Sequence, residues 1–239
     1  SKLIIAVSES TKRDIIKFLN VREEKINIIY EGARFNLLKF FSEKGKQEIK
    51  NNLNIGDFIL YIGSFHPRKN LVNLIKAFSY IIPKYSNSLY LIVVGYFSKK
   101  EVKNIDLLLN FLSLQRYVKL LGHISDEKIK QLFLTAKVFV FPSLYEGFGL
   151  PPLEAMACGC PVVVSNCGSL PEVCGDAAVY VNPYEPQDIA NGILKVLTDE
   201  SLRQQLIKKG FEQVKKFTWE NSVKKFIETL KKLQNNDIK

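Results

Sequence analysis

Two glutamates with glycines between them form the segment of this sequence that is best suited to chemistry. Glu146 and Glu154 lie eight positions apart, and Gly147 and Gly149 follow the first of them. Glycine lets a ligand approach the backbone closely, and the free N–H groups and positive dipole end at the start of a helix bind phosphate. Carboxylates on either side can accept hydrogen bonds from paired hydroxyls. The segment therefore predicts a site for a phosphorylated ligand that carries hydroxyl groups, as a nucleotide-sugar does.

A cationic pair, Arg68 and Lys69, lies in a second loop, directly before a helix expected at 70–82. Positive side chains are unfavourable at the start of a helix unless an anion binds there. A guanidinium can bind two phosphate oxygens at once, whereas an ammonium acts as a compact charge. The simpler alternative is that both side chains are solvated surface residues. We predict that they bind the same phosphate as the 146–154 segment.

Short apolar runs that alternate with helical patterns must position these residues. Strands are expected at 58–62, 90–94, 118–121, 138–141, 162–164 and 178–181, with helices at 70–82, 99–112 and 125–134. Near-continuous apolar strands joined by helices are typical of a parallel sheet covered on both faces. The predicted fold class is α/β, with a Rossmann-like doubly wound parallel sheet. The loops at the carboxyl ends of its strands should line one rim, where ligands bind.

Local helix signals refine this scheme. Glu154 is expected in the first turn of a short helix that ends at Gly159. Ser169 and Glu172, three residues apart, have the spacing of a capping box, in which each side chain accepts from the other residue's backbone N–H.

Composition limits the classes of function. The chain has 239 residues, of which 46% are hydrophobic, and this is ordinary for a globular protein. No apolar run approaches the roughly 20 residues of a membrane helix. The formal net charge of +10 favours an anionic donor and contact with an anionic membrane surface, although lysine pairs along the amphipathic C-terminal segment are equally explained as a solvated face. Nucleic-acid binding is not expected, because no base-reading module is visible.

The four cysteines, Cys158, Cys160, Cys167 and Cys174, cluster in the sequence. They lack the paired C-x2-C spacing of a structural zinc site, and both histidines lie far upstream. We therefore expect no metal site here, and no disulfides in what is expected to be a cytosolic protein.

Several motifs together resemble one family. The 146–154 segment resembles the glutamate-x7-glutamate signature of the retaining glycosyltransferases of family 4, also called glycosyltransferase group 1. Residues 63–70 resemble that family's loop with a basic pair and residues 122–125 its base-pocket turn, and residues 161–165 and 171–173 resemble later landmarks. The resemblance runs from the start of the chain to its last helix. It implies the C-terminal, donor-binding half of the two-domain GT-B fold.

The resemblance also implies roles for single residues. Arg68 and Lys69 would contact the donor diphosphate, Glu146 the hydroxyls of the donor sugar, and these three would carry catalysis. Glu154 would accept hydrogen bonds from the ribose. The other implied donor-binding positions are Gly63, His123, Ile124, Ser125, Gly147, Phe148, Gly149 and Leu150.

The implied reaction is attack by an acceptor hydroxyl on the face of the sugar from which the diphosphate leaves. It requires no metal and no cofactor besides the nucleotide-sugar substrate. Glycoside hydrolysis also uses two carboxylates, but hydrolase carboxylates flank one glycosidic bond, whereas these acids are expected at opposite ends of a donor.

The same resemblance divides the chain into three parts. Residues 1–34, with a strand at 3–7, a helix at 8–19 and a strand at 26–30, are expected to be a remnant of the N-terminal acceptor domain and the crossover between domains. Residues 35–217 form the nucleotide-sugar-binding domain, and residues 218–239 a helix that crosses back to the missing N-terminal domain of the same protein. An isolated fragment of this kind is expected to be inactive.

The predicted function is transfer of a hexose from a nucleotide-sugar to a saccharide or lipid-linked acceptor in cell-surface polysaccharide synthesis. Residues 175–178 and 182–183 resemble mannosyl-type members and favour GDP-mannose. Ser125 stands where some guanine-binding members have an acid, and a UDP-hexose therefore remains an alternative. A catalytically silent sugar-nucleotide-binding module and a GT-B phosphorylase or epimerase are rival functions. The expected location is the cytoplasm, peripheral to the inner face of the plasma membrane.

Overall fold

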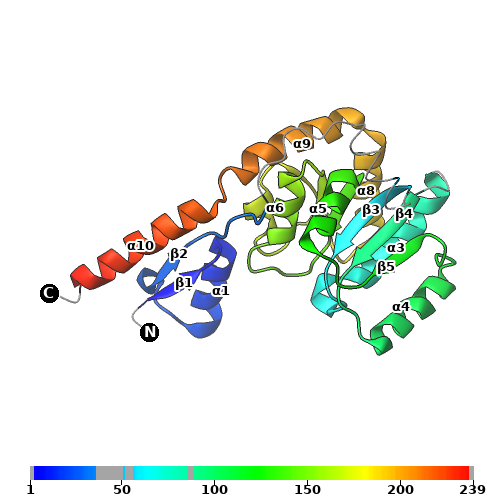
Figure 1. Ribbon diagram of the computed structural model, residues 1–239. Helices are drawn as coiled ribbons and strands as arrows, with labels where there is room; N and C mark the ends of the chain where they lie inside the picture. Colours follow the sequence, from blue (N-terminus) through cyan, green and yellow to red (C-terminus); the bar gives the residue numbers. More distant parts are fainter. Residues whose placement is uncertain (1–2, 36–50, 52–55, 86–88, 237–239) are drawn as a thin grey trace.

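A six-stranded sheet forms the centre of the protein. The computed structural model describes residues 3–35, 51, 56–85 and 89–236 of the chain. The strands are β3 (Asp57–Ile62), β4 (Leu89–Val94), β5 (Val118–Leu121), β6 (Val138–Phe141), β7 (Val162–Ser165) and β8 (Ala178–Val181). They are all parallel and lie in the order β5-β4-β3-β6-β7-β8 (Figure 1). This is the Rossmann-type order. Strands β3, β4 and β5 follow one another from the centre to one edge of the sheet, and β6, β7 and β8 then follow one another from the centre to the other edge.

Helices cover both faces of this sheet. They are α3 (Leu71–Ile81), α4 (Lys99–Phe111), α5 (Asp126–Thr135), α6 (Leu150–Ala157), α7 (Leu170–Cys174), α8 (Pro186–Thr198) and α9 (Glu200–Val214). One core cluster joins the sheet to α5, α6 and α7, and includes Phe133, Leu153 and Val173. The other joins it to α3, α4 and α8, and includes Phe78 and Ile193. The strands are apolar on both sides because both sides are buried, and the predicted doubly wound α/β fold is confirmed.

The first residues form a separate small unit. Strands β1 (Ile4–Ala6) and β2 (Ile26–Ile28) pair in parallel outside the main sheet, with α1 (Glu9–Leu19) and a 3-10 turn η1 (Glu23–Lys25) between them. A hydrogen bond joins the segment after this unit to the end of the main domain: the backbone N–H of Ala33 donates to the carbonyl of Phe217 at 3.2 Å. Figure 1 shows this unit in blue beside the long last helix.

The last helix, α10 (Trp219–Asn236), packs against the small unit along one side. The Ser222 hydroxyl donates to the carbonyl of Tyr30 at 2.5 Å, and the Asn27 amide donates to the Thr229 hydroxyl at 3.4 Å. In the described part of the chain, no helix combines the length and the apolar character needed to cross a membrane.

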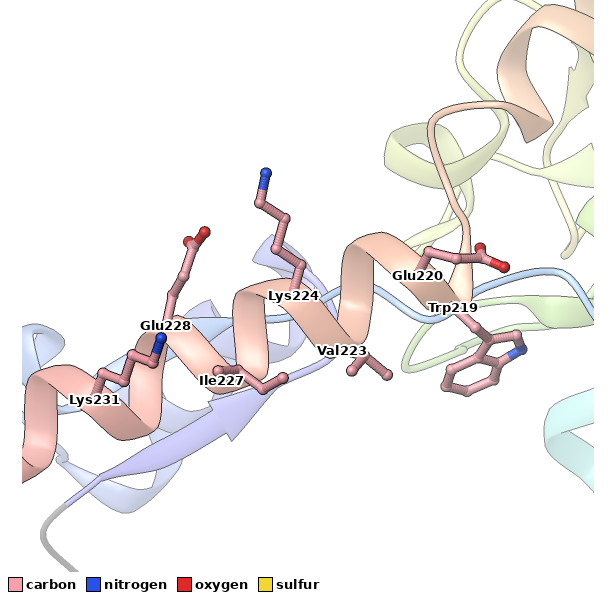
Figure 2. A pocket seen from close by; sticks show the side chains of 7 residues that line it. All are labelled: Trp219, Glu220, Val223, Lys224, Ile227, Glu228 and Lys231. Atoms are coloured by element: carbon pink, nitrogen blue, oxygen red, sulfur yellow. The ribbon is translucent and has the colours of Figure 1, made fainter.

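A shallow hollow of about 730 Å³ runs along another side of α10. Trp219, Val223 and Ile227, four residues apart, point to the same side of the helix there (Figure 2). All three side chains are about half exposed, and none belongs to the predicted site.

Candidate active site

The two loops predicted to bind phosphate follow β3 and β6, the neighbouring strands at which the sheet reverses. In this fold the crevice outside the carboxyl ends of such strands is where ligands bind. Nη1 of Arg68 lies 2.9 Å from Oε2 of Glu146, and Nζ of Lys69 lies 2.7 Å from Oε1 of the same carboxylate. The structure thus brings Arg68 and Lys69 into contact with Glu146, which lies 77 positions after Lys69 in the sequence.

The cationic pair is held in place by its backbone and by contacts of its charged groups. Residues 67–69 form a 3-10 turn, η2 (Pro67–Lys69), and the carbonyl of Arg68 accepts from the N–H of Leu144 at 2.8 Å. The Lys69 ammonium lies 4.8 Å from the centre of the Phe141 ring, a distance that allows a cation–π attraction. Nη1 of Arg68 also donates to the carbonyl of Tyr145 at 2.8 Å. Cations held in this way cost less to order when an anion binds.

Asn70 is a structural anchor that motif reasoning did not single out. Its side chain is buried and donates to the carbonyls of Pro142, at 3.0 Å, and Pro183, at 2.7 Å. Asn70 has a left-handed backbone with φ of 61°, which asparagine tolerates better than most residues. The amide therefore joins the loop after β3 to the loops after β6 and β8.

Gly63 lies where the loops after β3 and β4 meet. Its N–H donates to the carbonyl of Val94 at 2.9 Å. A Cβ at the neighbouring Gly95 would lie 2.1 Å from the carbonyl oxygen of Gly63, which is closer than atoms can approach. Gly63 thus packs closely against the end of β4, five residues before Arg68 in the same loop.

The 146–149 loop is held by side chains from elsewhere in the fold. The hydroxyl of Ser169 donates to the carbonyls of Glu146, at 3.0 Å, and Phe148, at 2.6 Å. The ring of Phe148 is buried 6.1 Å from the ring of Tyr30 and 5.6 Å from that of Phe217. Only the backbone of Phe148 therefore remains for a ligand.

The expected capping box at Ser169 and Glu172 is wrong. Ser169 makes no side-chain cap on α7, because its hydroxyl is engaged by the 146–149 loop. The Glu172 carboxylate instead accepts from the backbone N–H groups of Glu9, at 2.8 Å, and Ser10, at 3.3 Å. Both side chains serve contacts between segments that are distant in sequence, and these outweigh the local pattern.

The start of α6 also differs from the prediction. The helix begins at Leu150, so Glu154 lies in its second turn and not in its first. Pro151 and Pro152 are tolerated there because the N–H groups at a helix start have no intrahelical partner. Since proline has no N–H, the donors that remain at this helix end are those of Gly149 and Leu150. The start of α6 therefore offers an anion only two backbone N–H groups, fewer than the sequence suggested.

Glu154 is held by a residue that sequence reasoning missed. The Arg34 guanidinium binds it through Nε–Oε1 at 3.0 Å and Nη2–Oε2 at 3.4 Å, and reaches Oδ1 of Asp126 through Nη1 at 2.7 Å. Burial raises the pKa of the Glu154 carboxyl, and the charge of Arg34 opposes this shift. Arg34 belongs to none of the motifs found in the sequence. The only signal that could have marked it is its positive charge within the expected crossover between domains.

The expected base-pocket turn lies at the same end as Glu154. Ser125 caps α5 by accepting from the N–H of Lys128 at 3.4 Å, and Asp126 joins the turn to Glu154 through Arg34. Ile124 packs against the core, whereas Gly122 and His123 are exposed. Among the described residues, His123 makes no hydrogen bond with the other predicted site residues.

The assembled site has two ends of opposite charge. Around Glu146, two cations face one carboxylate, which leaves a formal charge of +1. Around Glu154, two carboxylates share one guanidinium, which leaves −1. The positive end suits a diphosphate, and the negative end suits a group that donates hydrogen bonds.

Comparison with known proteins points to one family. A family model described as "Glycosyl transferases group 1" matches residues 43–213. O-antigen chain mannosyltransferase B of Escherichia coli is 34% identical over 234 residues, which are 98% of this chain and 61% of that protein. O-antigen chain mannosyltransferase RfbU of Salmonella typhimurium is 32% identical over 199 residues, which are 82% of this chain and 51% of that protein.

Solved structures are similar over nearly the whole chain. Anabaena HepE in complex with UDP and glucose has a TM-score of 0.85 at 25% identity, and covers 97% of this chain and 63% of its own. Sucrose-phosphate synthase of Thermosynechococcus elongatus has a TM-score of 0.83 at 27% identity, and covers 98% of this chain and 59% of its own. The chain spans less than two thirds of the length of each of these relatives.

Proposed function

The chain belongs to the group 1 glycosyl transferases, and on this premise we propose that it is the donor-binding part of a nucleotide-sugar-dependent hexosyltransferase. The observation that carries the proposal is the convergence of Arg68, Lys69 and Glu146 at the carboxyl ends of β3 and β6. These side chains come from loops that only the fold brings together. A cationic pair fixed in the ligand crevice is what a departing diphosphate requires.

Donor binding, on this proposal, exchanges one ion pair for another. Glu146 neutralises part of the charge of Arg68 and Lys69 in the structure. The diphosphate takes the carboxylate's place on both cations, and Glu146 becomes free to accept from the sugar hydroxyls. At the other end Glu154 accepts from the ribose, and the N–H groups of Gly149 and Leu150 face the phosphate.

In the transfer step the bond between the anomeric carbon and the diphosphate oxygen breaks, and negative charge grows on the diphosphate. Arg68 and Lys69 stabilise that charge more in the transition state than in the ground state. The acceptor oxygen bonds to the anomeric carbon on the face that the diphosphate leaves, which retains the configuration. The acceptor's proton passes to the departing phosphate oxygen. Arg68 and Lys69 supply the positive charge on the diphosphate, so the proposed step uses no metal and no further cofactor.

Mannose is the favoured sugar, because relatives that this chain matches over 82% to 98% of its length are named O-antigen mannosyltransferases. We place the acceptor among saccharides or lipid-linked saccharides of cell-surface polysaccharide synthesis for the same reason. A UDP-hexose is the second candidate donor, supported by the similarity to a protein solved with UDP and glucose.

The division of the chain follows from the same proposal. Residues 1–34 belong with an acceptor-binding domain, residues 35–217 bind the donor, and residues 218–239 return to the acceptor side, as the contacts of α10 with Asn27 and Tyr30 support. The chain alone then binds donor without transferring sugar. We place the enzyme in the cytoplasm, where nucleotide-sugars are made, with peripheral contact to anionic lipid through its positive charge.

Calorimetric titration tests the assignment. GDP, UDP, ADP and their hexose conjugates are titrated separately into the chain, and GDP or GDP-mannose is expected to bind most tightly. Tighter binding of UDP would replace mannose by a UDP-hexose. Absence of binding by every one of them would overturn the donor-binding assignment, and robust sugar transfer by the isolated chain would overturn the division into domains.

A further inference from the structure

The start of α1 contacts the 146–149 loop directly, although 136 residues separate Thr11 from Gly147. The Ser8 hydroxyl donates to the carbonyl of Gly147 at 2.6 Å, and the Thr11 hydroxyl donates to the same oxygen at 3.0 Å. Ser8 is fully buried and also caps α1 by accepting from the N–H of Thr11 at 3.0 Å. One carbonyl of the loop thus receives two hydroxyls from outside the main sheet.

These bonds fix the direction of the loop's N–H groups. With Ser169 on Glu146 and Phe148, three successive carbonyls are held by hydroxyls. In a trans peptide the next residue's N–H points opposite to the carbonyl. Holding the carbonyls of residues 146–148 therefore aims the N–H groups of residues 147–149, in a segment that two glycines would otherwise leave free to rotate. Among the residues that the structure describes, no oxygen accepts from these three N–H groups.

Helix α1 is itself braced on either side of this contact. The Glu172 carboxylate accepts from the N–H groups of Glu9 and Ser10 at the helix start, where a negative charge is favourable. One turn further along, Asp14 accepts from the Tyr145 hydroxyl at 2.5 Å. Contacts at residues 145, 147 and 172 hold α1 in one position relative to the loop.

We propose that Ser8 and Thr11 are positioning residues, which aim the N–H groups of Gly147, Phe148 and Gly149 at the diphosphate and sugar of the donor. The inference rests on the proposed function and deepens it, because it makes donor affinity depend on the small β1–α1–β2 unit. If α1 moves away, the Gly147 carbonyl loses both donors and the loop is free to turn. Donor binding and the contact of α1 with the 146–149 loop then stabilise each other.

The test removes both hydroxyls and keeps the helix. Glycine at an N-cap is only a few tenths of a kcal/mol worse than serine, so Ser8→Gly with Thr11→Val should leave α1 formed, which circular dichroism checks. The nucleoside diphosphate that the wild-type chain binds best is then titrated. We expect about fivefold or greater loss of affinity from two lost hydrogen bonds and a misdirected loop.

Two single variants separate positioning from general damage. Thr11→Ser keeps the hydroxyl and should bind as the wild type does. Thr198→Val removes a hydroxyl that donates only within α8, to the Leu194 carbonyl at 2.8 Å, and should leave affinity unchanged. Loss in the double variant together with these two results supports the proposal.

Wild-type affinity in a folded double variant would overturn the proposal and leave the proposed function standing. Should the double variant fail to fold, Thr11→Val alone decides, with an expected loss of about twofold to threefold, and unchanged affinity there has the same meaning. A wild-type chain that binds no nucleoside diphosphate would instead overturn the proposed function.

Discussion

The two acids of the 146–154 segment are equally buried yet differently supported. Glu146 is 8% and Glu154 is 7% exposed. Glu146 lies on a loop between two cations, whereas Glu154 lies on α6 and shares a single guanidinium with Asp126. Since burial is the same, the surrounding charge must decide what each acid does. The 146–154 segment therefore contributes to two sites. The Glu146 end is suited to a reacting diphosphate, and the Glu154 end is suited to the hydroxyls of a ribose ring.

The largest expected effect separates the two acids by role. Glu146→Gln should lower the transfer rate of an enzyme that contains this chain by about 10²- to 10³-fold, the size seen when one polar group that stabilises a transition state is lost. The same change should leave the affinity for GDP intact or increase it, because it frees Arg68 and Lys69 from the carboxylate that neutralises them. Steady-state kinetics and titration measure both. Equal losses in rate and GDP affinity would abolish the proposed distinction.

Removing one cation should weaken binding of the diphosphate at the Glu146 end. Lys69→Met keeps an unbranched apolar side chain of similar length and removes the charge that lies over the Phe141 ring. A hydrogen bond to a charged group contributes about 1.5–3 kcal/mol, so GDP affinity should fall by about tenfold or more. Lys215→Met is a matched control, since that lysine pairs on the surface with Glu212. A similar loss from both variants would point to net charge alone.

A smaller loss is expected at the Glu154 end. Glu154→Gln should weaken GDP by about fivefold, because an amide is a poorer acceptor for the ribose hydroxyls than a carboxylate. The 2′,3′-dideoxy form of the nucleotide has no such hydroxyls and should bind both proteins equally. If the dideoxy nucleotide discriminates between them as strongly as GDP does, Glu154 does not bind ribose.

The smallest effect is a shift in pH dependence. Burial raises the pKa of Glu154, so GDP affinity should begin to fall, as the pH is lowered, above the pH at which an ordinary glutamate protonates. Arg34 lowers that pKa, and Arg34→Gln should therefore move this acid limb to higher pH, besides weakening GDP by about threefold at neutral pH. Titrations from neutral to acidic pH on both proteins check the sign. A limb that moves to lower pH in the variant would contradict it.

The contrast between the two acids extends to what the sequence could predict. The apolar runs before residues 63 and 142 marked β3 and β6, and the rule that ligands bind beyond the carboxyl ends of parallel strands then placed Arg68, Lys69 and Glu146 on one rim. The support of Glu154 was not predictable in this way. Arg34 lies 120 residues from Glu154 and belongs to no pattern that chemistry alone would mark.

Two local predictions failed for a related reason. Ser169 and Glu172 match a capping box, but a hydroxyl and a carboxylate satisfy whichever backbone groups the fold brings near, and here these belong to the 146–149 loop and α1. A helix start just before Glu154 leaves Pro151 and Pro152 outside the helix, whereas proline is well suited to a first turn and both lie within it. Local patterns set what a residue can do, and tertiary contacts select which of these it does.

A crystal structure of this chain with GDP bound tests the central claim most directly. We predict that the diphosphate contacts Arg68 and Lys69, that Glu146 has left both cations, and that the ribose hydroxyls donate to Glu154. A diphosphate bound away from the loops after β3 and β6, with the ion pairs of Glu146 unchanged, would contradict the account.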